Sequence, residues 1–260
     1  TNALVLFLAL LTLDAYAESS RPNVVFILAD DLGYETLSSN GGTPSQTPHL
    51  DKLAANGLRF TNCVSQPVCT PTRVTLLTGQ YPFRHGWVQH YDVPRWGGAG
   101  LRPDRFTTFA RVLRDAGYAT VIGGKWQINH LGKQRDILKQ HGFDEHCVWP
   151  GVEEGRPETR ERFWDGFLVT NGKRGNVPYG PDAINQFLID FMKRHKEKPF
   201  LLYYPMLLTQ GPLSGTPLKM AEAPLGKPAL YAGNVTYMDH LVGKLVAAVD
   251  ALGLKERTLI

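Results

Sequence analysis

The sequence predicts an α/β fold in which helices cover both faces of a doubly wound, mostly parallel sheet. Segments with apolar residues at helical spacing alternate with short apolar runs along the chain. The first run, Asn23 to Asp31, is apolar until it ends in two acids, as in a strand buried on both faces. With 43% hydrophobic and 20% charged residues among 260, the composition is globular and excludes disorder and coiled coil.

Helices and strands are expected to alternate in the following order. Strands are expected over the runs 23–31, 59–64, 119–125 and 200–206, and another begins near Thr258. Helices are expected over 47–57, from residue 69 onward, and over 107–118, 180–199 and 229–252. In the 107–118 helix, Phe109, Val112 and Leu113 should face inward and Gly117 should cap the end. Residues 149–181 are weakly periodic and rich in Gly, Arg and Glu, so we expect an insertion loop near the site.

The first 17 residues have the pattern of a signal peptide. An apolar run from Ala3 to Leu13 precedes the small-x-small sequence Ala15-Tyr16-Ala17. We therefore expect an exported protein, periplasmic or secreted, with one domain over 21–260; a retained lipid or membrane anchor is the alternative. No later segment approaches the roughly 20 apolar residues of a transmembrane helix, so no membrane span is expected after signal removal.

Charge and cysteine content narrow the partners. The formal net charge of +4 contains no dense Lys or Arg block, so no nucleic-acid partner is expected. Three cysteines are an odd number, which leaves at least one unpaired or modified in an exported protein. Cys63 and Cys147 are one candidate disulfide pair, and nothing in the sequence decides the matter.

The stretch PVCTPTRVTLLTG, residues 67–79, indicates a reactive cysteine. It places Cys69 at the start of a helix, one turn before Arg73. Helix N-termini and guanidinium groups both stabilise negative charge, which favours reactivity over a structural role. Asp30 and Asp31 end the first strand, and ligands bind at the carboxyl ends of strands in open α/β sheets.

Three motifs together resemble the sulfatase family of the alkaline phosphatase superfamily. They are ILADDLGY at 27–34, CTPTRVTLLTGQYPFRHG at 69–86 and GGKWQ at 123–127, and the resemblance runs from Arg21 to Ile260. The Cys-x-Pro-x-Arg signature that starts at Cys69 implies oxidation of this cysteine to formylglycine by a formylglycine-generating maturation enzyme. The aldehyde hydrates to a diol, and one hydroxyl attacks the sulfur of a sulfate ester.

The resemblance also implies a role for each matching residue. Residue 69 would be the nucleophile, Arg73 would stabilise its charge, and Lys125 would bind the sulfate oxygens. Asp30 and Asp31, together with residue 69, would hold a divalent cation. Ca²⁺ is favoured over Mg²⁺, although the sequence does not decide between them.

The sequence departs from the family's pattern in three places. Gln127 stands where the family often has a histidine that contacts the formylglycine, and Gln210 stands where it usually has a histidine that serves the leaving group. Both are expected to contact substrate, but Gln transfers no proton, and losing a general acid costs about 10²- to 10⁴-fold. The family completes its metal site with an Asp-Asn pair on the strand that would begin near Thr258. That pair is missing from the 260 residues, so we expect a domain truncated at its C-terminus, whose activity alone is in question.

The expected reaction is hydrolysis of a sulfate ester on a carbohydrate or aryl group. One alternative is a phosphatase or phosphonate hydrolase of the same superfamily, where a Thr or Ser nucleophile is more usual. The other is a non-catalytic binder of sulfated glycans, in which Gln127 and Gln210 record lost chemistry. His85 and His90 are interpreted as loop histidines with local hydrogen bonds, in preference to pocket-lining groups. The loop aromatics either stack on sugar or pack the lids over the pocket: Trp87, Tyr91, Trp96, Trp149 and Trp164.

Overall fold

A computed structural model describes residues 21–42, 45–218 and 226–260, so the predicted signal peptide lies outside the described residues. The described chain forms a seven-stranded sheet in the order β5-β4-β3-β2-β6-β1-β7. Its strands are β1 (Asn23–Leu28), β2 (Ala119–Lys125), β3 (Glu145–Trp149), β4 (Trp164–Thr170), β5 (Lys173–Tyr179), β6 (Phe200–Pro205) and β7 (Thr258–Leu259). The predicted strands at 119–125, 200–206 and from Thr258 are confirmed.

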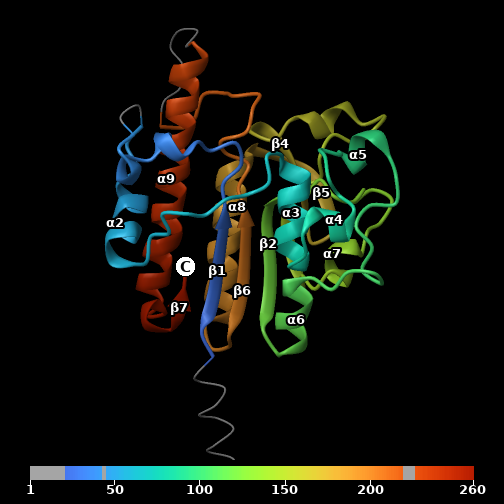
Figure 1. The fold of residues 1–260 in the computed structure, drawn as a ribbon, viewed down its shortest axis with the longest axis horizontal. Coiled ribbons are helices and arrows are strands. Elements are labelled where there is room, and N and C mark those ends of the chain that lie inside the picture. The colour runs from blue at the N-terminus through green and yellow to red at the C-terminus, as the bar shows by residue number, and fades with distance from the viewer. Residues whose placement is uncertain (1–20, 43–44, 219–225) are drawn as a thin grey trace, which may run out of the picture.

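The helices occupy the connections between these strands (Figure 1). The α-helices are α2 (Pro48–Asn56), α3 (Cys69–Thr78), α4 (Pro82–His85), α5 (Val93–Trp96), α6 (Phe109–Asp115), α7 (Ile137–Gln140), α8 (Gly180–His195) and α9 (Lys227–Ala251). Short 3₁₀ turns are η1 (Tyr34–Thr36), η2 (Ser38–Asn40), η3 (Pro157–Arg160) and η4 (Lys255–Arg257). Among the described segments, no helix is long and apolar enough to span a bilayer.

The sheet is mostly parallel and is covered on both faces. Strands β3, β2, β6, β1 and β7 pair in parallel, whereas β4 pairs antiparallel with both β3 and β5 at one edge of the sheet. On β6, Leu202 and Tyr204 belong to the core under α8 and α9, while Leu201 and Tyr203 belong to the core under α3 and α6. Figure 1 shows α8 behind the sheet and α3 and α6 in front of it. The predicted doubly wound architecture is therefore confirmed.

A buried asparagine fixes the start of the central strand. Asn23 donates from Nδ2 to Thr258 Oγ1 at 3.2 Å and accepts at Oδ1 from the Phe200 N–H at 3.2 Å. It thus joins β1 to both of its neighbours, β7 and β6. Buried polar groups need such partners because an unmade hydrogen bond in the interior is costly.

Two predicted segments are wrong. Residues 59–64 form no strand: Phe60 is 69% and Val64 is 96% exposed, so β-favouring side chains lack a sheet to pack on. Residues 149–181 are not a long loop, because they contain the hairpin β4–β5. Its turn residues Asn171 and Gly172 have φ values of 46° and 82°, as the Asn-Gly signal of a two-residue hairpin requires.

On α6, Phe109 and Leu113 pack against the core as predicted, but the prediction for Val112 is wrong. Val112 is 56% exposed, whereas Ala110 is fully buried and Phe109 and Leu113 are partly buried. Two helical positions subtend about 200°, so burial of Ala110 turns Val112 toward solvent. Gly117 lies one residue beyond the cap residue Ala116, with a φ of 90°.

Candidate active site

The predicted site residues converge at the carboxyl ends of β1 and β2, against the N-terminus of α3. Asp30 follows β1, Lys125 is the last residue of β2, and Cys69 is the first residue of α3. A cavity of about 390 Å³ opens here, lined among others by Asp30, Asp31, Cys69 and Arg73. These groups therefore lie together at one edge of the sheet.

Asp30 is the centre of a buried ion network. Its Oδ2 accepts hydrogen bonds from Lys125 Nζ at 2.7 Å and Arg73 Nη2 at 2.9 Å, and all three side chains are buried. Burial raises the pKa of Asp30, but the charges and hydrogen bonds of Arg73 and Lys125 outweigh it and hold that pKa below its usual value. Burial and the Arg73 charge in turn lower the pKa of Lys125. Two cations therefore surround one ionised carboxylate.

Arg73 ties α3 to the end of β2. One turn inside the helix, its Nη1 donates to the Lys125 carbonyl at 2.9 Å, while Nη2 binds Asp30. The Nε atom is buried without a hydrogen-bond partner among the described residues. A charged donor of this kind is costly to leave unpaired, which makes the position suited to an anionic acceptor.

Cys69 meets two polar side chains from separate loops. Its Sγ lies 3.1 Å from His90 Nδ1 and 3.5 Å from Gln127 Oε1. The contact with His90 was missed, because residues 21 positions apart meet only through the fold. Burial, followed by the charge of Lys125, lowers the pKa of His90.

Gln127 is held in one orientation by Asp92, a second residue that sequence reasoning missed. Gln127 has a φ of 66°, and its Nε2 donates to Asp92 Oδ2 at 3.0 Å. With the amide nitrogen engaged, Oε1 points to Cys69 and accepts from its thiol. Gln127 thus contacts the candidate nucleophile as a hydrogen-bonding group that transfers no proton.

The loop after β6 anchors the Asp30–Asp31 turn. Thr209 donates from its N–H at 3.1 Å and from its hydroxyl at 2.8 Å to the Asp30 carbonyl. Asp31 has a φ of 54°, and its carbonyl accepts from the Tyr231 hydroxyl at 2.9 Å. Gln210 follows Thr209 directly, but it is not among the residues that line the cavity.

Arg162 fixes the backbone of the Gln210 loop. Its Nη2 donates to the Gln210 carbonyl at 3.1 Å and also to the Gly211 carbonyl. The guanidinium lies 4.8 Å from the Trp149 ring centroid and 5.1 Å from that of Phe163. Burial lowers the pKa of Arg162 to about 10, although the charges of nearby carboxylates oppose this shift. Because this pKa is still well above 7, Arg162 stays charged at neutral pH. It lies in the segment expected to be a loop, and no motif singled it out.

Asp30 and Asp31 are suitable ligands for a hard cation, but two carboxylates are too few to complete its coordination. Asp30 and Asp31 offer the oxygen ligands that Ca²⁺ and Mg²⁺ prefer. Within the described ranges, no group of three or more His, Cys, Asp or Glu side chains is placed to hold a metal ion. The donors present supply part of a site, and Ca²⁺ takes about 6–8 ligands.

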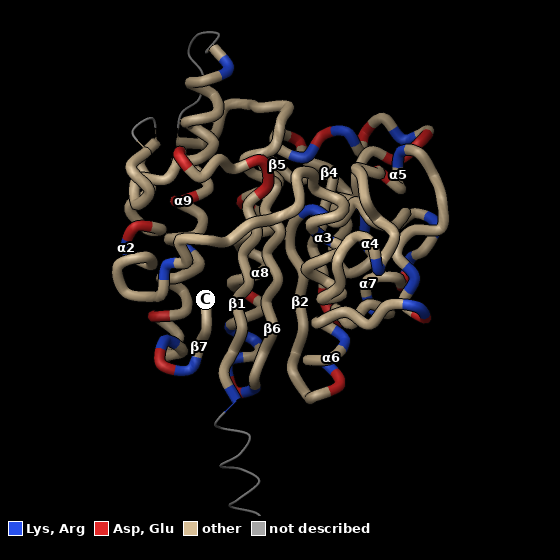
Figure 2. Tube along the Cα trace, viewed as in Figure 1, with Lys and Arg blue, Asp and Glu red and all other residues tan. Residues whose placement is uncertain are grey.

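The remaining residues singled out from the sequence include two tryptophans and the three cysteines. Trp149 is buried with its Nε1 donating to the Thr159 carbonyl, and Trp164 packs on Tyr179 with a centroid distance of 4.7 Å. These two therefore pack the fold. The three cysteines are all free, so the candidate disulfide is not formed, and burial raises the pKa of Cys147 to about 11. Figure 2 shows Lys and Arg spread along the chain with acidic residues among them.

Comparison with known proteins bears on this arrangement. The sequence model of the Sulfatase family matches residues 22–260. Arylsulfatase A from Bos taurus is 35% identical over 94% of this chain and 52% of its own length. Human N-acetylgalactosamine-6-sulfatase is 30% identical over 92% of this chain and 48% of its own. The chain thus spans about half the length of these curated relatives.

A solved structure shares the fold. The crystal structure of Ps i-CgsB in complex with k-i-k-neocarrahexaose superposes with a TM-score of 0.77 at 27% identity, covering 92% of this chain and 57% of that one.

Proposed function

The chain belongs to the sulfatase family, and on that premise we propose that it hydrolyses sulfate esters of carbohydrates with residue 69 as the nucleophile. One observation carries the proposal. The cavity beside β1 brings Cys69, at the first position of a helix, together with Asp30, Asp31 and Arg73. A helix N-terminus and buried cations around the reacting residue are the features that stabilise an anion in the transition state.

The buried cations give the site its preference for an anion. Lys125 and Arg73 share the single carboxylate oxygen of Asp30, so positive charge exceeds negative charge inside the network. Lys125 Nζ has three hydrogens and donates one of them to Asp30, and Arg73 Nε makes no hydrogen bond with the residues that the structure describes. Both can bind oxygens of a tetrahedral sulfate, the roles expected of them as catalytic and substrate-binding residues.

We assign the nucleophile to an oxidised form of Cys69. A maturation enzyme of the host would convert the side chain –CH₂SH to the aldehyde –CHO of formylglycine, with dioxygen as oxidant and two electrons from a reductant, releasing the sulfur as H₂S and the second oxygen atom as water. The support is the Cys69-x-Pro71-x-Arg73 sequence and its place at the start of α3. Gln127 and His90 contact the thiol of Cys69. The oxidised group at residue 69 would form its hydrogen bonds with the same two side chains.

We also propose, from the sequence resemblance, that Asp30, Asp31 and residue 69 contribute to holding a divalent cation, Ca²⁺ or Mg²⁺, although the described residues do not place these three side chains as a complete metal-binding group. Such an ion supplies a Lewis acid that lowers the pKa of a bound hydroxyl. Asp30 would contribute through the carboxylate whose pKa its two cations already depress. Further ligands beyond these three would be required.

The leaving group bears on the substrate class. Gln127 and Gln210 offer hydrogen bonds but no proton, so esters with good leaving groups should react faster than poor ones. The relatives' names include an N-acetylgalactosamine-6-sulfatase and a protein solved with a neocarrahexaose. They support a sulfated carbohydrate as the substrate.

The test is sulfate release by protein coexpressed with a formylglycine-generating enzyme and assayed with Ca²⁺. We expect turnover of 4-nitrophenyl sulfate and of N-acetylgalactosamine 6-sulfate, abolished by Cys69→Ala and kept by the matched control Cys63→Ala, an exposed free cysteine. Peptide mass spectrometry reports whether residue 69 is oxidised. Turnover that survives Cys69→Ala refutes the proposed nucleophile.

The same assay separates the alternatives. Binding of sulfated sugar without sulfate release, when residue 69 is oxidised and metal is present, supports the non-catalytic binder. Faster cleavage of 4-nitrophenyl phosphate than of the sulfate supports a phosphatase.

We further propose export to the periplasm or medium, on the apolar run that precedes Ala15-Tyr16-Ala17. N-terminal sequencing of the protein from its host tests this. A mature N-terminus beyond residue 17 supports export, and retention of residues 1–17 contradicts cleavage.

A further inference from the structure

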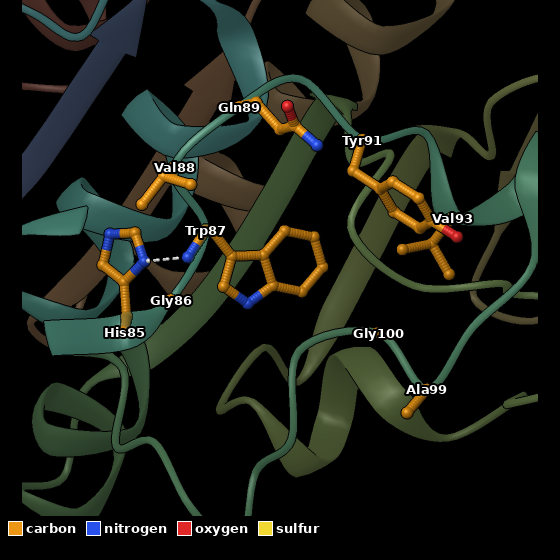
Figure 3. Close-up of a pocket in the computed structure, with 9 residues that line it drawn as sticks. All are labelled: His85, Gly86, Trp87, Val88, Gln89, Tyr91, Val93, Ala99 and Gly100. Atoms are coloured by element: carbon orange, nitrogen blue, oxygen red, sulfur yellow. Dashed lines mark hydrogen bonds between the residues drawn. The ribbon is translucent and has the colours of Figure 1, made fainter. Parts of the chain in front are cut away.

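A second cavity, formed by residues 85–100, has a different chemical character (Figure 3). Its volume is about 330 Å³, at the small end of the roughly 300–1,000 Å³ of ligand pockets. The lining contains no Lys, Arg, Asp or Glu, and consists of His85, Gly86, Trp87, Val88, Gln89, Tyr91, Val93, Ala99 and Gly100. In Figure 3 the rings of Trp87 and Tyr91 lie on the same side of the 99–100 segment.

A chain of contacts connects this cavity to Cys69. Thr70, the next residue on α3, places its Oγ1 3.3 Å from His90 Nδ1 and donates to the Tyr91 carbonyl at 3.1 Å. His90 contacts Cys69, and its ring lies 5.3 Å from that of Trp96. The Trp96 ring lies 5.6 Å from Tyr91, which lines the cavity. His90, Trp96 and Tyr91 thus form a continuous aromatic surface from the nucleophile to the second cavity.

The rings of this surface pack on one another and are also partly open to solvent. Trp96 is 50% and Tyr91 is 37% exposed, unlike Trp149, whose ring is buried and hydrogen-bonded. The polar groups at the cavity are uncharged: burial lowers the pKa of His85, whose Nδ1 accepts from the Trp87 N–H at 3.0 Å. Exposed rings and neutral polar groups suit a ligand with apolar faces and hydroxyl edges, which describes a sugar ring without sulfate.

We propose that this second cavity and the Trp96 ring bind a neutral sugar ring joined to the sulfated sugar, so that the preferred substrate is a sulfated oligosaccharide. The inference rests on the proposed function for the position of the sulfate at residue 69. Arg73 lines the first cavity, and it donates a hydrogen bond to the carbonyl of Lys125. We therefore place the sulfate group at these two cations. The division of charge between the two cavities then separates the sulfated ring from its neutral neighbour.

The test compares Tyr91→Ala, the rescue variant Tyr91→Phe and the control Phe60→Ala, an exposed aromatic that lines neither cavity. Binding of lactose, cellobiose and diacetylchitobiose is measured by saturation-transfer NMR and tryptophan fluorescence. We expect at least one of these neutral disaccharides to bind, with affinity about 3- to 10-fold weaker in Tyr91→Ala and unchanged in the other two variants. Circular dichroism checks that each variant is folded.

Kinetics supply the second readout. On lactose sulfated at its galactose, Tyr91→Ala should lower kcat/KM about 3- to 10-fold, while kcat/KM for 4-nitrophenyl sulfate stays the same. An equal loss on both substrates, or failure of the wild type to bind any of the three disaccharides, overturns the proposal. Disaccharide binding that depends on Tyr91, in a protein that releases no sulfate, keeps the sugar site and refutes the proposed hydrolysis instead.

Discussion

Replacing Asp30 with Asn is expected to destabilise the fold strongly. Asp30 Oδ2 accepts from Lys125 at 2.7 Å and Arg73 at 2.9 Å, with all three groups buried. Asn has nearly the same size but leaves two cations facing each other without a counter-charge. Removing one partner of a buried ion pair costs about 3–5 kcal/mol, which for a chain of this length lowers Tm by about 6–20 °C.

The assay is thermal unfolding at pH 7 in the presence of a chelator, so that metal binding does not contribute. Asp115→Asn, at an exposed carboxylate on α6, is the matched control and should change stability by less than about 0.5 kcal/mol. In the Asp30→Asn background, a further Lys125→Met change removes the second cation and should restore part of the loss. An Asp30→Asn protein that unfolds with the wild type, or a double variant weaker than Asp30→Asn alone, refutes this reasoning.

The pH dependence follows from the depressed pKa of Asp30. Because its folded-state pKa lies below the usual 3.8, the stabilisation is fully present above pH 3.8 and is lost as pH falls through the folded-state pKa. The gap in Tm between wild type and Asp30→Asn should therefore narrow below about pH 4. A gap that stays constant on acidification contradicts the assigned ion pairs.

Two further substitutions test contacts that hold the fold together, one between α9 and α2 and one at the Gln210 loop. Gly243→Ala on α9 should destabilise the protein by about 1–3 kcal/mol in denaturant unfolding, because a Cβ there would lie 2.5 Å from the His49 ring. The control is Gly233→Ala on the same helix, which has open space around it and should be neutral or stabilising. Arg162→Met should cost about 1–3 kcal/mol and speed proteolysis of the loop at Gln210, since the carbonyls it binds lose their donor. Unchanged proteolysis would show that this loop is held by other contacts.

Sequence periodicity predicted the parts of the fold that bury a continuous face. The strand at 119–125 and the helix at 180–199 combine long apolar patterns with clear ends, and both are confirmed. The errors come where burial depends on distant partners. Residues 59–64 have β-favouring side chains but no neighbouring strand. The β4–β5 hairpin was overlooked because the segment around it is rich in Gly, Arg and Glu and because β5 itself is polar. The Asn171-Gly172 pair was the signal that could have revealed that hairpin.

For the candidate site, topology explains which residues were predictable. Asp30, Lys125 and Cys69 end strands or begin a helix, so the order of elements alone brings them to one sheet edge. His90, Asp92 and Arg162 come from irregular segments, and their contacts are with residues far away in the sequence. No local pattern encodes such contacts, which is why they emerged only from the structure.

The energetics of the ion network argue for a functional role. A buried charge cluster seldom stabilises a protein relative to apolar residues of the same volume, so Asp30, Arg73 and Lys125 are poorly explained by stability. Arg73 Nε is buried without a partner among the described residues, which adds to that cost. An anion bound between Arg73 and Lys125 would supply the missing acceptor and balance the second cation. This arrangement supports the proposed sulfate site at Arg73 and Lys125.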